Sequence, residues 1–403
     1  MDNSYYKKKI EELEREIKAR FVSNEEPIEA LILNLLHRRS TALIRAPRGL
    51  GKSTLMLLLL KGVYGDKYVV ISGASEVRRG EVVGRLHIPS LESEGIEKVV
   101  WSEFVKTQGK GLDEANRLNP YTAASIYHML QFGEVWAYSQ KLKVGDYTLI
   151  ANENPHDQTT FVHPPPFYDR FDICVYLSSL SFSEKFILED ILDKYDGDLV
   201  GSMPQVLTPE ELAEIRREIE RVEIDVEIKG LINLLVRDLQ ACIRGREYSE
   251  IKPPTLCEGC HFMREICSRI REGPSERATI VLTNLVKAKV WLSGNIDVGE
   301  ILKMSLWVFP HRLVLSSGTN ALGELQDILY REEQKMTERE ARRQWFILNR
   351  LYREFSRDLY NKAKEIALED LVFAEEIIRL EEKWLKEGKI REEEMLRNYI
   401  LPR

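Results

Sequence analysis

Short apolar runs, separated by polar segments, organise the first half of the chain. The segment Thr41–Arg45 (TALIR) predicts a short buried strand, and Leu55–Leu60 (LMLLLL) predicts a buried helix that follows it. Two further buried strands are predicted at Lys67–Ser72 (KYVVIS) and at Ile173–Leu177 (ICVYL). Buried strands that alternate with helices are typical of parallel sheets. We therefore expect an α/β core built on a parallel sheet.

Two segments between these strands have other patterns. Residues 74–98 are polar and predict an irregular insertion. Residues 136–150 alternate around a turn at Val144-Gly145-Asp146, which predicts a β-hairpin that leads into another buried strand. That strand is expected to end in the sequence ANENP, residues 151–155.

Helical patterns dominate both ends of the chain. Residues 1–22 predict a charged helix with a thin apolar stripe, and residues 322–403 read as helix almost throughout. A helix start is predicted at Thr208, because a proline follows it and a glutamate lies three residues later. We expect four parts: an N-terminal helix (1–22), an α/β core (23–200), an α-helical lid (201–320) and a helical C-terminal extension (321–403).

Composition and charge exclude some classes of protein. The chain has 403 residues, of which 43% are hydrophobic and 31% are charged, and its formal net charge is −7. A chain with this net negative charge lacks the overall positive charge that is typical of nucleic-acid-binding proteins, although a local basic channel would be compatible with the net charge. No apolar run has the roughly 20 residues of a membrane span, and the charged N-terminus does not resemble a signal peptide. The expected location is the cytoplasm.

The loop between the first strand and the first buried helix carries the strongest chemical signal. Its sequence APRGLGKST, residues 46–54, differs by one residue from the phosphate-loop pattern G-x-x-x-x-G-K-[ST], since alanine stands where the first glycine is usual. A strand, a glycine-containing loop and a helix N-terminus together direct backbone N–H groups at phosphate. Lys52 supplies a charge for the β- and γ-phosphates, and the Ser53 hydroxyl can bind Mg²⁺. The candidate nucleotide-binding residues here are Pro47, Arg48, Gly49, Leu50, Gly51, Lys52, Ser53 and Thr54.

An acidic pair supplies the second candidate for phosphate chemistry. Asp113 and Glu114 occupy the position expected of a Walker B motif, in which Asp113 contributes to the Mg²⁺ shell and Glu114 polarises the attacking water. The preceding residues 108–112 (QGKGL) depart from the usual run of apolar residues. This departure leaves the strand geometry open, so hydrolysis is less securely indicated than nucleotide binding.

Taken in order, the segments APRGLGKS, LDEANR, QFGEV, ANENP and YDRFD resemble the MoxR family of AAA+ ATPases. This family lies in the AAA+ clade that has an extra hairpin before sensor 1, together with the minichromosome-maintenance helicases. The resemblance covers roughly residues 20–315 and extends to a lid segment, residues 275–278 (SERA), that is similar to the sensor 2 motif. It implies an AAA+ core followed by a helical lid.

The resemblance also implies residue roles and partners. Asn154 would be sensor 1, Arg277 would be sensor 2, and Arg170 would be an arginine finger that reaches the nucleotide of a neighbouring subunit. An arginine finger that acts on a neighbouring subunit implies a ring of identical chains, and the expected ring is a hexamer. MoxR-like proteins usually act with a von Willebrand A-domain partner, often during maturation of metal centres or assembly of complexes.

Four of the five cysteines fall within one short stretch of the lid. Cys242, Cys257, Cys260 and Cys267 follow the spacing C-x₁₄-C-x₂-C-x₆-C, which fits a single structural metal centre. A 4Fe–4S cluster and a Zn²⁺ ion both satisfy this pattern, and reduced cysteines or a disulfide are the plain alternative. The sequence CEGCH also matches the haem-attachment pattern C-x-x-C-H. Cys174 lies in an apolar strand and is expected in the core.

The sequence and the resemblance together favour an ATP-hydrolysing, Mg²⁺-dependent ring ATPase with a chaperone-like remodelling or assembly role. A nucleic-acid motor, as a helicase or nuclease subunit, is the alternative from another class, since Lys141 and Lys143 of the hairpin could contact phosphates in a ring pore. The net negative charge does not favour nucleic acid. A nucleotide-gated scaffold with little hydrolysis is a third reading, consistent with the unusual strand before Asp113.

Overall fold

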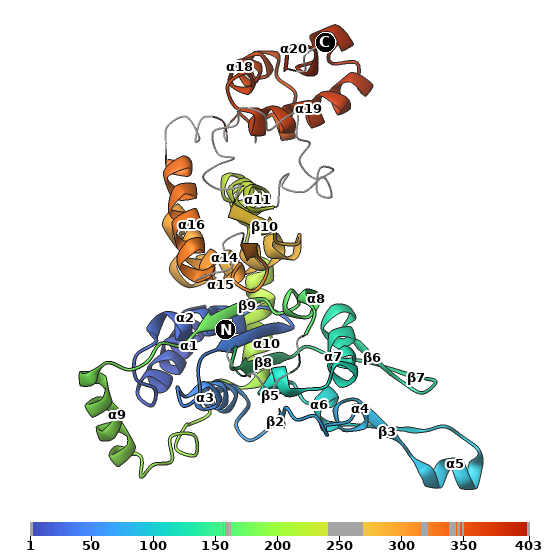
Figure 1. The fold of residues 1–403 in the computed structure, drawn as a ribbon, viewed down its shortest axis with the longest axis vertical. Coiled ribbons are helices and arrows are strands. Elements are labelled where there is room, and N and C mark those ends of the chain that lie inside the picture. Colours follow the sequence, from blue (N-terminus) through green and yellow to red (C-terminus); the bar gives the residue numbers. More distant parts are fainter. Residues whose placement is uncertain are drawn as a thin grey trace. The chain divides into compact units, whose positions relative to one another are not determined.

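The computed structural model divides the chain into two compact units (Figure 1). The first unit comprises Met1–Val222 together with Lys287–Asn295, and the second comprises Glu223–Val286 together with Ile296–Arg403. The structure describes residues 3–155, 157, 161, 163–240, 269–315, 321–337, 344, 347–348 and 350–400.

A five-stranded parallel sheet forms the centre of the first unit, with the strand order β2-β5-β8-β1-β9. The α/β class and the parallel sheet predicted from the sequence are confirmed. Both β1 and β8 are buried along almost their whole length, and each carries three consecutive apolar residues at its centre. The strands are β1 (Ser40–Arg45), β2 (Tyr68–Ser72), β5 (Gly109–Asp113), β8 (Thr148–Glu153) and β9 (Ile173–Tyr176).

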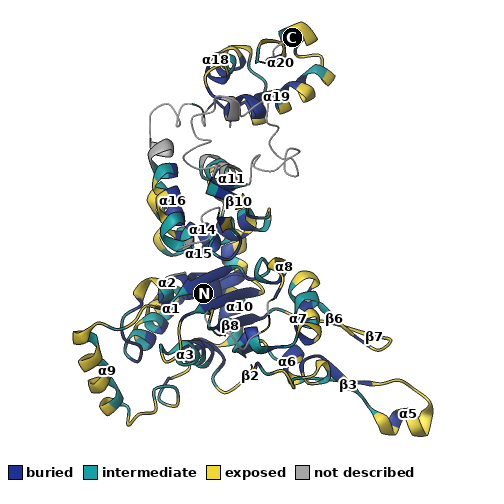
Figure 2. Ribbon diagram, viewed as in Figure 1, coloured by how far each residue is buried: buried dark blue, intermediate teal, exposed yellow. Residues whose placement is uncertain are grey.

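Helices pack around this sheet and bury their apolar sides. The thin stripe of α1, formed by Ile10, Leu13 and Ile17, is buried, and α1 contacts α2 and α3. In contrast, α9 has no buried residue and exposes Phe182 and Phe186 (Figure 2). The helices of this unit include α1 (Asn3–Lys18), α2 (Glu25–Leu35), α3 (Lys52–Tyr64), α7 (Pro120–Phe132), α8 (Pro165–Tyr168), α9 (Phe182–Lys194) and α10 (Pro209–Glu220).

The unusual sequence before Asp113 forms a regular central strand, β5. A Cβ atom added at Gly109 would lie 2.6 Å from Tyr64 Cδ2, and one added at Gly111 would lie 2.8 Å from Val70 Cγ2 and 3.2 Å from Met56 Sδ. The two glycines therefore make room for side chains of α3 and β2. Successive residues of a strand point to opposite faces, so the residue between them serves the other side of the sheet.

That residue, Lys110, is fully buried. Its ammonium group donates hydrogen bonds to the carbonyl oxygens of Phe104 and Thr107, at the end of the short helix α6 (Glu103–Lys106), and lies over the rings of Phe104 and Tyr147. Burial lowers the pKa of Lys110 to about 7. Lys110 thus stands where an apolar residue is usual in this strand. It is accommodated there because it donates to carbonyl oxygens that have no partner within α6.

Two short hairpin-like insertions lie beside each other in the first unit (Figure 1). Residues 74–98, predicted to be irregular, contribute α4 (Arg79–Val82), β3 (Gly84–Leu86) and α5 (Ile88–Glu94), and β3 pairs with β4 (Val99–Trp101). The second hairpin pairs β6 (Glu134–Ala137) with β7 (Gln140–Lys143) and turns at Tyr138, where φ is 52°. The turn predicted at Val144–Asp146 was therefore wrong, because those residues join β7 to β8. Gln140 Nε2 donates to the Glu97 carbonyl oxygen at 2.6 Å and so ties the two insertions together.

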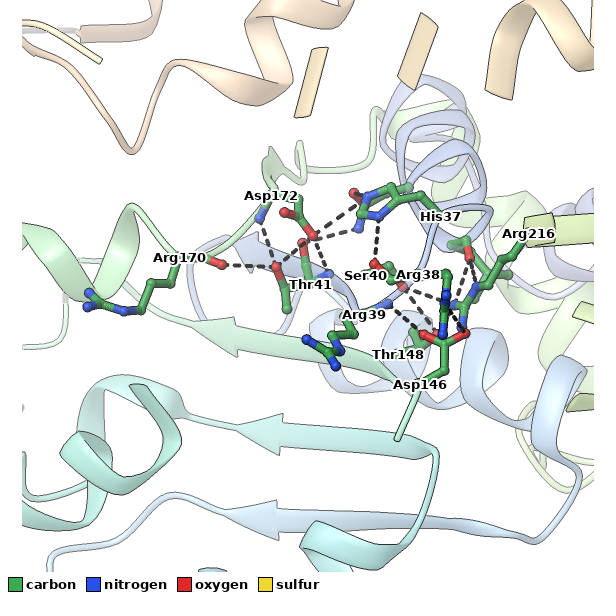
Figure 3. A network of polar contacts seen from close by, with 12 residues as sticks. His37, Arg38, Arg39, Ser40, Thr41, Asp146, Thr148, Arg170, Asp172 and Arg216 are labelled. Atoms are coloured by element: carbon green, nitrogen blue, oxygen red, sulfur yellow. Dashed lines mark hydrogen bonds and ion pairs between the residues drawn. The ribbon is translucent and has the colours of Figure 1, made fainter. Parts of the chain in front are cut away.

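A buried polar network joins the amino ends of β1 and β8 (Figure 3). Arg216 of α10 is buried, and its guanidinium donates to Asp146 at 3.0 Å and to Thr148 Oγ1 at 2.7 Å. The backbone N–H of Arg39 donates to the same carboxylate at 2.7 Å. Because an unpaired buried charge is costly, this network fixes α10 to the sheet.

The described residues of the second unit form helices and one small ladder. The strands β10 (Ile270–Glu272) and β11 (Val314–Leu315) pair in antiparallel fashion, and Arg269 bridges to Glu324 at 3.2 Å and to Asp327. The helices are α11 (Val226–Leu239), α14 (Arg277–Ser293, whose end belongs to the first unit), α15 (Val298–Val308) and α16 (Ala321–Thr337).

The C-terminal residues form a helical cluster with its own apolar core, as the helical pattern of the tail predicted. Trp384 and Tyr360 pack at the centre, with ring centroids 5.5 Å apart, and Glu381 accepts the Leu396 N–H at 2.8 Å. The elements are α18 (Arg357–Ala367), α19 (Leu371–Lys386), η4 (Glu392–Glu394) and α20 (Arg397–Ile400). Within the part of the chain that the structure describes, no helix is long and apolar enough to cross a membrane.

The buried Lys110 makes stability depend on pH. Its ordinary pKa is 10.5, and its folded pKa is about 7. Between these values the unfolded lysine is charged and the folded one is neutral, so unfolding takes up a proton and stability rises with pH, by up to about 1.4 kcal/mol per pH unit. Lys110→Met lacks this titration, so its stability relative to the wild type should be highest near pH 6 and lowest near pH 9. Urea unfolding at both pH values measures this difference, with exposed Lys106→Met as the control. An equal pH dependence of Lys110→Met and wild type would contradict the prediction.

Candidate functional site

The loop between β1 and α3 is shaped for an anion. Gly49 and Gly51 adopt φ values of +80° and +78°, a conformation that side-chain-bearing residues rarely adopt. A Cβ at Gly51 would also lie 2.8 Å from the Phe21 ring. The helix α3 begins at Lys52 without a side-chain cap. Its first N–H groups are therefore available to a phosphate.

Lys52 lies within this loop. Its Nζ donates to the carbonyl oxygens of Ala46 and Pro47, both at 2.8 Å. Burial lowers its pKa, and the nearby carboxylates of Asp113 and Glu114 act in the opposite direction. The loop thus holds the ammonium group close to its own backbone, from which it can reach a bound phosphate.

Ser53 and Asp113 meet where α3 begins and β5 ends. The Ser53 hydroxyl lies 2.9 Å from Asp113 Oδ1 and 3.1 Å from Oδ2. Hydroxyl and carboxylate oxygens at such a distance form a donor set that a hard cation prefers. The residues predicted to hold Mg²⁺ are therefore brought together, and their chemistry fits that ion.

Glu114 follows directly and has an unusual backbone. Its φ and ψ are both 50°, and its N–H donates to Asn152 Oδ1 at 3.0 Å. The left-handed conformation ends β5 and starts the turn η1 (Ala115–Arg117). The Glu114 carboxylate lies 2.9 Å from Arg117 Nη1.

Two asparagines from the end of β8 reach the same place. Asn154, the predicted sensor residue, lines the pocket described below, and its carbonyl oxygen accepts from Asn116 Nδ2 at 2.9 Å. Asn152 is fully buried and joins Glu114 to Ser53, because its Nδ2 lies 3.4 Å from Ser53 Oγ. The sequence analysis missed Asn152. Residues two apart on a strand share a face, so the pattern N-E-N contained a signal for both.

These groups surround one pocket of about 380 Å³, a size that suits a small-molecule ligand. Most of the predicted phosphate-loop residues line it, together with both members of the acidic pair. Arg170 is not among the described residues that do so. The lining residues are Arg48, Gly49, Leu50, Gly51, Lys52, Ser53, Thr54, Asp113, Glu114, Asn116, Arg117, Asn152, Asn154 and Asp157.

Arg170 lies elsewhere in the first unit, after α8. Its backbone is held at the start of β1, where the Thr41 hydroxyl lies 3.1 Å from its carbonyl oxygen and Asp172 accepts the Thr41 N–H at 2.7 Å. The Arg170 side chain extends away from this network (Figure 3), and Nη2 donates to Gln131 at 2.6 Å. The guanidinium packs against its own unit, because it also donates to the Pro166 carbonyl oxygen and lies over the Tyr127 ring, 5.9 Å from the centroid.

Two other predicted sites remain predictions. Arg277 begins α14 in the second unit. The four cysteines Cys242, Cys257, Cys260 and Cys267 lie outside the described residues. Among the residues that are described, no group of three His, Cys, Asp or Glu side chains is arranged to hold a metal ion. Cys174 is buried in β9, as expected.

Comparisons with known proteins identify the fold. No family model matches the chain, and no curated protein matches it in sequence. Among solved structures, it is similar to the crystal structure of a candidate ATPase from Cytophaga hutchinsonii, with a TM-score of 0.65 and 19% identity. The similarity covers 83% of this chain and 96% of that one. At this identity the likeness establishes a shared fold.

The Asn152 side chain should contribute to the stability of the fold. Asn152→Ala removes the acceptor of the Glu114 N–H and leaves a polar group unsatisfied, so we expect a loss of stability of about 1–3 kcal/mol. Chemical unfolding measures this loss. The exposed Asn295→Ala should change stability by less than about 0.5 kcal/mol. Equal effects of the two substitutions would show that the Asn152 contact is not stabilising.

Proposed function

We propose that this chain is an ATP-hydrolysing AAA+ protein of the MoxR type. The observation that carries the proposal is the meeting of Ser53 and Asp113, 2.9 Å apart, beside a glycine loop and Lys52 in one pocket. The fold shared with a candidate ATPase is consistent with it. The regular strand β5, which ends at Asp113, is a further support for the proposal.

The residues of the pocket have complementary roles in such a reaction. The loop N–H groups and Lys52 would bind the β- and γ-phosphates, and Ser53 with Asp113 would hold Mg²⁺, which neutralises charge on the phosphates. Glu114, with Asn154 nearby, would orient a water. The water oxygen bonds to the γ-phosphorus, the bond to the β–γ bridging oxygen breaks, and Glu114 accepts a proton of the water.

The oligomeric state that we propose rests on Arg170. The Arg170 guanidinium is not among the described groups that line the pocket of its own unit, so in a ring of identical chains it would serve the pocket of a neighbouring subunit. We propose a hexameric ring that remodels or assembles other proteins, with a von Willebrand A-domain protein as a partner. Arg277 would contact nucleotide from the lid.

A nucleic-acid motor is the second candidate, and the β6–β7 hairpin favours it. Trp136 is 45% exposed there, and Lys141 lies over its ring, 5.3 Å from the centroid. Aromatic and basic side chains on one hairpin can stack on bases and contact phosphates. Single-strand binding that weakens steeply with salt would support this candidate over the chaperone.

Complementation between two inactive variants tests both the ATPase and the ring. Glu114→Gln and Arg170→Ala should each lower ATP turnover by about a hundredfold or more while nucleotide binding persists. In a 1:1 mixture, a pocket with an intact Glu114 and a neighbour with an intact Arg170 arises in about a quarter of interfaces, so activity should partly return. ATP turnover before and after mixing measures this.

Each negative result has a separate meaning. A wild-type protein that binds ATP without hydrolysing it contradicts the ATPase and favours the nucleotide-gated scaffold. An active wild type whose variants fail to complement contradicts the role of Arg170 in a neighbouring subunit. Glu114→Gln mixed with itself is the control.

We also propose that the four lid cysteines bind one 4Fe–4S cluster, with Zn²⁺ as the alternative. Anaerobically purified protein should then contain iron and acid-labile sulfide and should absorb visible light. The variant Cys257→Ser should lose the iron, the sulfide and the absorption. Zinc without iron would establish the alternative. Protein that contains neither metal would contradict a structural centre.

A further inference from the structure

An ion pair that the proposed mechanism does not use lies inside the pocket. Arg117 Nη1 lies 2.9 Å from Glu114 Oε2, and the two residues are three apart across the turn η1. The carboxylate proposed to activate water is therefore held by a neighbouring guanidinium.

A second carboxylate holds the other end of that guanidinium. Asp157 Oδ2 lies 2.8 Å from Arg117 Nη2 and 3.0 Å from Arg48 Nη2. The Asp157 side chain is only 4% exposed, whereas that of Arg48 is 71% exposed. Asp157 thus anchors one arginine from the phosphate loop and one from the turn after Glu114, and it connects the two segments.

The charges that line the pocket balance. Three cations, on Arg48, Lys52 and Arg117, face three carboxylates, on Asp113, Glu114 and Asp157. A bound triphosphate adds negative charge to this set, and arginine binds phosphate oxygens with two parallel hydrogen bonds as readily as it binds carboxylates. A γ-phosphate therefore competes with Glu114 for Arg117.

From this geometry, and on the basis of the proposed ATPase function, we propose that Arg117 is a positioning residue that couples the γ-phosphate to Glu114. Without a γ-phosphate, Arg117 holds the Glu114 carboxylate. With one, Arg117 turns to the phosphate while Asp157 keeps it in place, and Glu114 is released toward the water. Arg117 thus contacts the γ-phosphate that ATP has and ADP lacks, and this contact frees the Glu114 carboxylate to act on the water.

Calorimetric titration with two nucleotides tests this proposal. The probes are Mg²⁺ with ADP, and Mg²⁺ with the ATP analogue whose β–γ bridging oxygen is replaced by NH. In Arg117→Ala, affinity for the analogue should fall about tenfold while affinity for ADP changes by less than about twofold. ATP turnover should fall in kcat more than it changes in KM. Arg117→Lys keeps the charge but loses the two parallel hydrogen bonds, so its affinity for the analogue should lie between those of Arg117→Ala and the wild type.

The matched control is Arg217→Ala, which removes an arginine from an exposed ion pair of the same spacing with Glu214, outside the pocket. It should leave both affinities and kcat unchanged. Equal losses of ADP and analogue affinity in Arg117→Ala would overturn the proposal and leave Arg117 a structural residue. Because binding is measured without hydrolysis, the test stands even if the wild type proves inactive as an ATPase.

Discussion

The close packing of α3 on β5 is the constraint on which the site depends. Side chains of α3 occupy the space that Gly109 and Gly111 leave above the strand, and the Tyr64 hydroxyl donates to Thr148 at 2.9 Å on the neighbouring strand. Ser53 lies at the start of that helix and Asp113 at the end of that strand. A side chain at either glycine would force the helix away from the sheet. The 2.9 Å contact between Ser53 and Asp113 therefore has its origin in residues outside the pocket.

The other face of β5 carries a buried polar side chain, that of Lys110. A glycine has no side chain of its own to pack, so on the glycine face the packing of β5 depends on side chains of α3 and β2. Lys110 points to that other face, where it fills the space between β5 and α6 and satisfies two carbonyl groups. Its burial opposes the charged form, as the lowered pKa shows. The strand thus combines close packing on one face with a costly polar contact on the other.

The sequence predicted those parts of the fold and site that local pattern encodes. The phosphate loop has a fixed spacing, so Lys52 and Ser53 were identified correctly as neighbours in the pocket, and the apolar runs predicted the parallel sheet. The turn between β6 and β7 was misplaced, because Gly145 suggested a hairpin turn whereas Tyr138 adopts the left-handed conformation instead. Asn152 and Arg117 were missed because their roles depend on which strands become neighbours. Their partners are 99 and 40 residues away, on Ser53 and Asp157, and a single sequence does not contain these pairings.

The strand β1 gives a physical reason why one subunit's pocket and its Arg170 would act together. Its end leads into the phosphate loop, and Thr41, near its beginning, holds the backbone of Arg170 and the Asp172 carboxylate. The strand is paired on both sides, with β8 and β9, so it moves as a rigid element. A displacement of the loop on nucleotide binding would be transmitted along six residues to the segment that carries Arg170. In the proposed ring, each pocket would thereby influence the arginine offered to the next one, without any contact between the two nucleotides.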